Sequence, residues 1–355
     1  MGSKIQPILT PSLTTVQKLS GKAVAIDACT WLHQFLKVNV HSKQGNERLV
    51  LQDKTCRTIN HLRGFLYRTI YLLENDVWPV FVFDGVKSKK IRRGNGSECS
   101  LHGEHERIIK FYKDAMANEM FSLAKKIGKQ MTFIYPIAIA ETKRLLRYIG
   151  MPVVEAPGEG EAQCNQLLQK KLVDAAVTQD ADALLFGSTI VIKNLAVKNN
   201  PEKRRRSEGT VLFESSNIEK YALHKILGEL GITKEQLVDI GILVGTDFNQ
   251  GIHGIGPKTA LKLVKEHGYI EDIATHVEKY HYSSLGIDKP RRRPFSKELD
   301  ELRDVFLKPV VDESIKNLSW NTTNETKVRQ LLLEDHSFSD GLVKKALHRI
   351  EKATT

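Results

Sequence analysis

The stretch from Ala156 to Gly187, APGEGEAQCNQLLQKKLVDAAVTQDADALLFG, is the most informative about the fold and the functional site of this chain. It holds two acidic pairs, each with one residue between its members: Glu159 with Glu161, and Asp180 with Asp182. The first pair falls in the first turn of an expected helix, where the helix dipole favours negative charge. The second pair follows a short apolar strand, residues 175–178, and ligands bind at the carboxyl ends of strands in α/β sheets. Either pair alone could be a helix cap or a turn, but their connection by one helix and one strand predicts a shared carboxylate cluster.

The composition indicates a soluble protein with a polyanionic partner. The chain has 355 residues, enough for one large α/β domain or two modest ones, and a net charge of +11. The four cysteines form no C-x-x-C pair, so disulfide bonds and structural zinc are not expected. No apolar run reaches membrane-spanning length, and the N-terminus lacks the apolar core of a signal peptide. We therefore expect an intracellular protein without membrane contact, nuclear in a eukaryote and cytoplasmic in an archaeon.

Apolar strands that end in aspartate recur along the chain. The segment KAVAIDA, residues 22–28, ends its strand at Asp27, and VWPVFVFDG, residues 77–85, ends its strand at Asp84. Further short strands are expected at 151–155 and 189–194, and helices at 55–75, 136–149, 215–229 and 233–244. We expect residues 1–20 to be irregular and at best an ordered arm. This alternation predicts an α/β fold with a central, mostly parallel sheet flanked by helices.

The segment after Asp84 begins with a basic run, VKSKKIRR at residues 86–93. It continues through a glycine- and serine-containing stretch into a helical pattern at 104–128. Because the segment is long for a crossover between strands, we interpret residues 86–133 as a helical insertion over the acidic cluster. The spacing of Cys99, His102 and His105 could hold a metal, but a solvated loop explains it better. A second basic run, residues 203–206, could be a nuclear localisation patch or a solvated loop.

A glycine-containing turn near residue 250 predicts a phosphate contact. Asp247 lies just before it, and three glycines shape it: Gly251, Gly254 and Gly256. Pro257 then takes the first position of a helix, and backbone N–H groups at such a helix N-terminus suit a phosphate. Three lysines of this helix are expected to face the polyanionic partner: Lys258, Lys262 and Lys265.

Seven acidic residues are thus expected to converge: Asp27, Asp84, Glu159, Glu161, Asp180, Asp182 and Asp247. So many like charges need counter-ions, and oxygen ligands without histidine or thiolate suit Mg²⁺ or Mn²⁺ better than zinc. Two such ions about 3.5–4 Å apart promote an in-line displacement at phosphorus. From the residues alone, we interpret the chain as a metal-dependent phosphodiesterase that acts on nucleic acid.

Over nearly its whole length the chain resembles the flap endonuclease/XPG family of structure-specific 5′ nucleases. The principal matching segments are AIDA at 25–28, VFVFDG at 80–85, APGEGEAQ at 156–163, TQDADALLFG at 178–187 and LVGTDFNQGIHGIGPKTALKL at 243–263. The resemblance extends into the C-terminal part through VFLKPVVD at 305–312 and LLLEDHSFSDGLVKKALHRI at 331–350. It implies a PIN-like nuclease fold with a helical arch, and two Mg²⁺ ions, replaceable by Mn²⁺, on the seven acids. It also implies a helix-two-turn-helix motif at about 238–268 that grips duplex DNA, usually with a bound K⁺.

The implied activity is that of a 5′ flap endonuclease and 5′–3′ exonuclease that hydrolyses DNA phosphodiesters in replication and repair. The implied partner is branched or flapped DNA, bound by a monomer. The implied organisation is an N-terminal nuclease region, residues 1–105, with the arch at about 86–133. An internal nuclease region, 134–265, and a C-terminal helical region, 266–355, would pack on the same core.

Three features depart from the family pattern. The N-terminal signature M-G-I-x-G-L is present only as Met1-Gly2. The basic pair of the arch does not align cleanly, and the candidates for its first, catalytic member are Lys89, Lys90, Arg92 and Arg93. Arg107 or Lys110 would be the second member. The chain ends at Thr355 without the glutamine-and-aromatic motif that holds a sliding clamp, so clamp binding is not predicted.

Two other functions stay open. A four-way-junction resolvase of the same family is suggested by FDGV at 83–86 and GEGEAQC at 158–164. Against it, the span from Asp84 to Glu159 is long enough for a full arch. A catalytically inactive DNA-binding protein would have lost part of the acidic set, and all seven acids are present. We therefore expect a flap-type nuclease.

Overall fold

The computed structural model describes residues 4–37, 40–41, 48–49, 59–85, 131–195, 218–276 and 299–355. Within these residues, seven strands form one sheet in the order β1-β9-β8-β7-β2-β5-β6. Their bounds are β1 (Ser12–Thr14), β2 (Lys22–Asp27), β5 (Val77–Phe83), β6 (Val153–Glu155), β7 (Ala175–Val177), β8 (Ile190–Lys193) and β9 (Ile218–Ala222). The strands from β8 to β6 run parallel, whereas β9 and β1 are antiparallel additions at one edge. The expected α/β fold with a mostly parallel sheet is confirmed.

Two central strands are apolar on both sides because both faces of the sheet are covered. Side chains alternate between the faces, so Ile26 of β2 and Phe81 of β5 enter one apolar core, while Ala25 and Val82 enter another. The first core receives α1 (Ala28–Lys37), α2 (Asn60–Glu74) and α6 (Met131–Tyr148); the second receives α7 (Gly160–Gln169). Ile26 pairs with Phe81 and Val177, so β2, β5 and β7 end at the same edge of the sheet.

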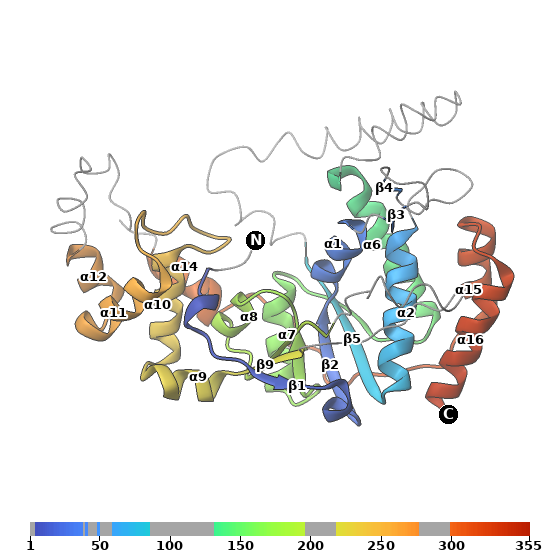
Figure 1. Ribbon diagram of the computed structural model, residues 1–355, viewed down its shortest axis with the longest axis horizontal. Helices are drawn as coiled ribbons and strands as arrows, with labels where there is room; N and C mark the ends of the chain where they lie inside the picture. The colour runs from blue at the N-terminus through green and yellow to red at the C-terminus, as the bar shows by residue number, and fades with distance from the viewer. Residues whose placement is uncertain are drawn as a thin grey trace.

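The C-terminal segment packs on α2 and α6, two of the helices that cover the first core (Figure 1). It consists of α15 (Glu325–Arg329), the π-helix η5 (Gln330–Asp335) and α16 (Asp340–Thr354), which lies beside α2. Arg349 of α16 binds Glu74 of α2 through two hydrogen bonds of 2.7 and 2.8 Å. His61 of α2 and His336 contact opposite carboxylate oxygens of the buried Glu141 of α6, at 2.9 and 3.2 Å.

A separate group of helices, here called the helical unit, lies at the other end of the sheet (Figure 1). It comprises α9 (Leu223–Leu230), α10 (Lys234–Val244), α11 (Pro257–His267), α12 (Ile270–His276) and α14 (Leu299–Leu307), with the short α8 (Asp182–Leu185) beside α10. Isoleucine and valine side chains of α10, α11 and α12 bury around Phe306 of α14. A capping box starts α10: Thr233 accepts from the Gln236 amide, and Gln236 accepts from the Thr233 amide.

Three sequence-based expectations about elements were wrong. Described residues before Lys22 are not irregular throughout, because β1 extends the sheet edge and the 3₁₀ helix η1 (Gln6–Ile8) lies against α11. The expected helix at 215–229 begins only at Leu223; Ile218 and Tyr221 are buried in β9, where tertiary pairing overrides the helical pattern. α6 begins at Met131 and contains Pro136, which the sequence pattern placed at the helix start. Among the described residues, no helix is both long and apolar enough to cross a membrane.

Candidate active site

Four of the seven acidic residues of the sequence analysis lie at the carboxyl edge of the sheet. Asp27 is the last residue of β2, and Asp84 follows β5 directly. Asp180 follows β7, and Asp182 is the first residue of α8. Because these strands are parallel neighbours, their ends bring side chains from distant parts of the chain to one place.

Asp27 and Asp84 lie close together. One carboxylate oxygen of each and the Cys29 sulfur lie within 4.8 Å of one another. The amide of Thr30 donates to Asp27 at 3.1 Å, and the Thr30 hydroxyl donates to its second oxygen. The amide of Gly160 donates to Asp84 at 2.8 Å, and a Cβ at Gly160 would come within 2.8 Å of that carboxylate. The start of α7 is therefore held against Asp84, and a larger residue than glycine would displace this carboxylate.

Thr178 links the two acidic pairs. Its hydroxyl lies 3.3 Å from an oxygen of Asp27 and 3.4 Å from an oxygen of Glu161, and it accepts from the Asp180 amide at 3.1 Å. The Asp182 amide donates to Asp180 at 3.0 Å. Glu159 is the buried N-cap residue of α7, one residue before the glycine that holds Asp84.

The pKa values show that these carboxylates repel one another. Burial, followed by the charge of Asp84, raises the pKa of Asp27 to about 6. Burial raises the pKa of Glu161 well above its ordinary value, and the charges of Asp180, Asp27, Asp182 and Asp84 raise it further. The cluster is thus short of positive charge, which a bound cation would supply.

Asp247 belongs to the same electrostatic environment although it lies in the helical unit. Burial raises the pKa of Asp180, the Asp182 amide opposes this shift, and the charge of Asp247 raises the pKa again. Lys193 of β8 is buried near these acids and donates to Gln6 at 2.6 Å. Burial lowers the pKa of Lys193, and Asp180 is the first of the acids that oppose this shift.

The donor set fits hard divalent cations. Crowded carboxylate oxygens at strand and helix ends are the ligands that such ions prefer, and their raised pKa values show that positive charge would stabilise them. Sequence reasoning missed two contributors to this site, Thr178 and Cys29. The position of Thr178, two residues before Asp180, is a weak signal. Cys29 belongs to no C-x-x-C pair, but it follows the strand-ending Asp27 by two residues.

The turn after α10 has the geometry that the glycines predict. Gly251 has a φ of +71°, and a Cβ there would come within 2.5 Å of the backbone of Gly245 and Val244. Gly254 also has a positive φ, +82°, whereas Gly256 is an ordinary N-cap residue before Pro257 at the start of α11. The Ile252 amide donates to the Leu243 carbonyl at 2.8 Å, which closes the turn onto α10.

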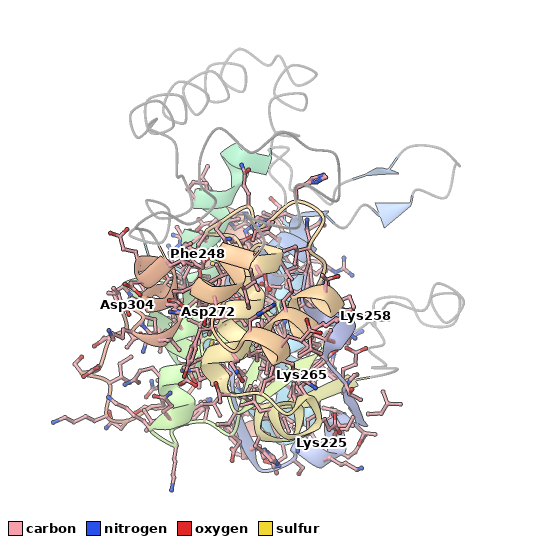
Figure 2. All side chains as sticks on the ribbon, turned by 90° about the vertical axis from the view of Figure 1, so that its left-hand side faces the viewer. Lys225, Phe248, Lys258, Lys265, Asp272 and Asp304 are labelled. Atoms are coloured by element: carbon pink, nitrogen blue, oxygen red, sulfur yellow. The ribbon has the colours of Figure 1, made fainter. Side chains whose placement is uncertain are left out.

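The helix that follows carries the predicted lysines. Lys258 and Lys265 of α11 lie on the same side of the helical unit as Lys225 of α9 (Figure 2). Lys262 is 73% exposed and lies 3.7 Å from Glu266 one turn later, a separation that leaves it available to a polyanion. These lysines supply positive charge, and the N-terminus of α11, which has no side-chain cap, supplies backbone N–H groups that suit a phosphate.

Several predicted residues lie outside the described part of the chain. These are the arch candidates Lys89, Lys90, Arg92, Arg93, Arg107 and Lys110, the Cys99–His102–His105 group, and the basic run at 203–206. Their predicted roles stay predictions.

Comparisons with known proteins agree with the geometry. The chain matches the XPG N-terminal domain model over residues 3–98 and the XPG I-region model over residues 150–247. It is 36% identical over 343 residues to flap endonuclease 1 of Ignicoccus hospitalis, covering 95% of this chain and 89% of that protein. Flap endonuclease-1 from Methanococcus jannaschii superposes with a TM-score of 0.72 at 27% identity, covering 99% and 98% of the two chains. The catalytic core of Rad2 in complex with DNA substrate shares the fold, with a TM-score of 0.65 at 22% identity and coverage of 98% and 97%.

Proposed function

Because this chain belongs to the flap endonuclease/XPG family of structure-specific 5′ nucleases, we propose that it cuts flapped DNA at the carboxyl edge of its sheet. It is a metal-dependent phosphodiesterase whose substrate is branched DNA. The observation that carries the location is the convergence of carboxylates at this edge of the sheet. Oxygens of Asp27 and Asp84 lie within 4.8 Å of each other, and the Thr178 hydroxyl lies 3.3 Å from Asp27 and 3.4 Å from Glu161. Such an enzyme serves DNA replication and repair, in the nucleus of a eukaryote or the cytoplasm of an archaeon.

The proposed ions are two Mg²⁺, for which Mn²⁺ can substitute. Seven residues would hold them: Asp27, Asp84, Glu159, Glu161, Asp180, Asp182 and Asp247. When bound, such ions lower the pKa of water and offset the charge that develops on phosphodiester oxygens. Their affinity should fall with pH below about 6, because a protonated Asp27 is a poorer ligand.

The remaining groups of the site orient these carboxylates. The Gly160 amide fixes one oxygen of Asp84. Thr30 holds both oxygens of Asp27, one through its amide and one through its hydroxyl, and Thr178 lies between Asp27 and Glu161. Fixed carboxylates need no reorganisation when charge develops on the substrate, which favours electrostatic stabilisation of the transition state.

DNA would be bound by the turn between α10 and α11. The groups proposed to contact duplex backbone are Gly251, Gly254, Gly256, Lys258, Lys262 and Lys265. A K⁺ ion within this turn is part of the proposal, because the helix-two-turn-helix motif that the segment resembles usually binds one. Residues 86–133 would form an arch whose basic run, residues 86–93, steers a free 5′ strand to the metals. We further propose a monomer whose regions 1–105, 134–265 and 266–355 share one core, supported by the packing of α16 on α2.

The deciding experiment compares three substrates with Mg²⁺: a free 5′ flap, the same flap with its 5′ end blocked by a bulky protein, and an intact four-way junction. The proposal predicts rapid cleavage of the free flap alone, because a blocked end cannot pass beneath an arch. Equal cleavage of blocked flaps and junctions would instead indicate the resolvase alternative.

A further inference from the structure

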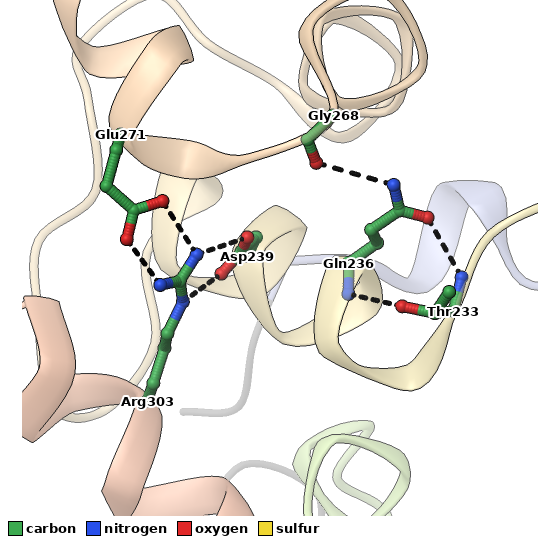
Figure 3. A network of polar contacts seen from close by, with 6 residues as sticks. All are labelled: Thr233, Gln236, Asp239, Gly268, Glu271 and Arg303. Carbon is green, nitrogen blue, oxygen red and sulfur yellow. Dashed lines mark hydrogen bonds and ion pairs between the residues drawn. The ribbon is translucent and has the colours of Figure 1, made fainter.

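One arginine joins three helices of the helical unit. Arg303 of α14 donates to both carboxylate oxygens of Asp239 in α10, through Nε at 2.7 Å and Nη2 at 2.8 Å (Figure 3). The same guanidinium reaches both oxygens of Glu271 in α12, through Nη1 and, at 3.0 Å, through Nη2. A planar guanidinium with two bidentate partners restricts the angles between the helices that it joins.

The two acidic partners differ in burial. The side chain of Asp239 is 2% exposed, and burial raises its pKa although Arg303 opposes the shift. Loss of the guanidinium would leave a buried carboxylate without its counter-charge, which is strongly unfavourable. Glu271 is half exposed, so its contact adds little to stability and chiefly fixes where α12 begins.

These contacts lie at the far end of the DNA-binding helix. α11 ends at His267, Gly268 takes a φ of +82°, and α12 starts two residues later. Gln236 near the start of α10 donates to the Gly268 carbonyl at 3.3 Å (Figure 3). Both the Gly268 contact and the Glu271 contact therefore tie the C-terminal end of α11 to α10, whose own C-terminal end forms the glycine turn.

We propose that Arg303 is a positioning residue for DNA binding, an inference that rests on the proposed function of the turn and α11. The turn after Val244 fixes one end of α11, and the clamp of Arg303 with Asp239 and Glu271 fixes the other. Together they set the direction in which Lys258, Lys265 and the helix N-terminus face the phosphates. Arg303 itself touches no DNA in this scheme. The ligand is duplex DNA, recognised through its backbone.

The test measures the dissociation constant, KM and kcat of Arg303→Gln with a 5′-flap substrate. We expect about tenfold weaker duplex binding and a higher KM with nearly unchanged kcat, since distant positioning residues shift binding by such amounts. The salt dependence should flatten by about 0.9 in log–log slope for each phosphate that the variant no longer binds. Arg303→Lys should be intermediate, because an ammonium cannot hold both carboxylates bidentately. Unchanged binding and KM would overturn the proposal, as would a fall in kcat alone, which indicates only less folded enzyme.

Arg349→Gln is the matched control, because Arg349 makes a comparable bidentate pair with Glu74 far from this unit. It should leave the dissociation constant unchanged; an equal weakening would show that removal of any ion pair weakens binding. If Arg303→Gln does not fold, Glu271→Ala decides, since it keeps the buried Asp239 pair. Weaker binding supports the proposal and wild-type binding overturns it. Binding is measured without divalent ions, so a wild-type protein that binds duplex but cuts no flap refutes the proposed function separately.

Discussion

Replacing Gly251 by alanine should disable the DNA-binding turn. Gly251 has a φ of +71°, and an added Cβ would lie 2.5–2.6 Å from backbone atoms of Val244 and Gly245. These atoms belong to the end of α10 and cannot move as a flexible side chain would. The left-handed conformation costs about 1–2 kcal/mol for alanine. Overpacking adds about 1–3 kcal/mol.

The expected loss is therefore about 2–5 kcal/mol for the native turn. Because the turn can rearrange while the rest of the fold persists, most of this loss should appear as weaker DNA binding. At the lower figure the dissociation constant would rise about 30-fold. Fluorescence anisotropy with a 5′-flap duplex, without divalent ions, measures this directly, and circular dichroism confirms that the fold is retained.

Gly341→Ala is the control, at a glycine far from this turn. Gly341 lies in the first turn of α16, and nothing lies within 4 Å of an added Cβ. Its dissociation constant should stay within about twofold of the wild type, since an unstrained surface change is nearly neutral. Equal effects of the two substitutions, or wild-type binding by Gly251→Ala, would show that this backbone geometry is not needed to bind DNA.

Three further predictions concern other parts of the chain. Burial raises the pKa of Glu141, but hydrogen bonds from His336 and His61 outweigh it and hold the pKa at about 2, against an ordinary value of 4.5. This carboxylate therefore adds about 3 kcal/mol of stability that is complete above pH 4.5 and lost as the pH falls through 2. Urea unfolding should show that Glu141→Gln loses less stability than the wild type on acidification, and equal losses would contradict this assignment. Alanine at the four basic positions between Lys89 and Arg93 should lower the single-turnover cleavage rate more than duplex affinity; the reverse order would argue against a steering role. Cys29→Ser should weaken inhibition by Cd²⁺ and remove sulfur–cadmium absorbance, because thiolates prefer soft cations, and unchanged absorbance would place cadmium elsewhere.

The central strands were predictable from the sequence because each is a single continuous run of apolar residues. β2 and β5 are continuous apolar runs, and each is followed or ended by an aspartate that the parallel sheet brings to one edge. The turn before α11 was also predictable, because glycines favour tight turns and proline favours the first position of a helix.

Features that depend on residues distant in the sequence could not be predicted. β9 contains IEKYA, whose strand conformation comes from pairing with β8 and β1 and not from its own pattern. Cys29 becomes a candidate metal ligand only because Asp84, which follows β5, lies beside it. The Arg303 clamp joins three helices, and a sequence pattern does not indicate which acids an arginine will reach.

Asp180→Ala tests most directly whether the carboxylate cluster is the site of metal-dependent cleavage. Cleavage of a free 5′ flap with Mg²⁺ and DNA affinity without Mg²⁺ should be measured on the same preparation. We expect cleavage to be abolished while affinity is equal or tighter, because the substitution removes a metal ligand and a negative charge near phosphate. Cleavage at the wild-type rate would show that the cluster is not the site of catalysis.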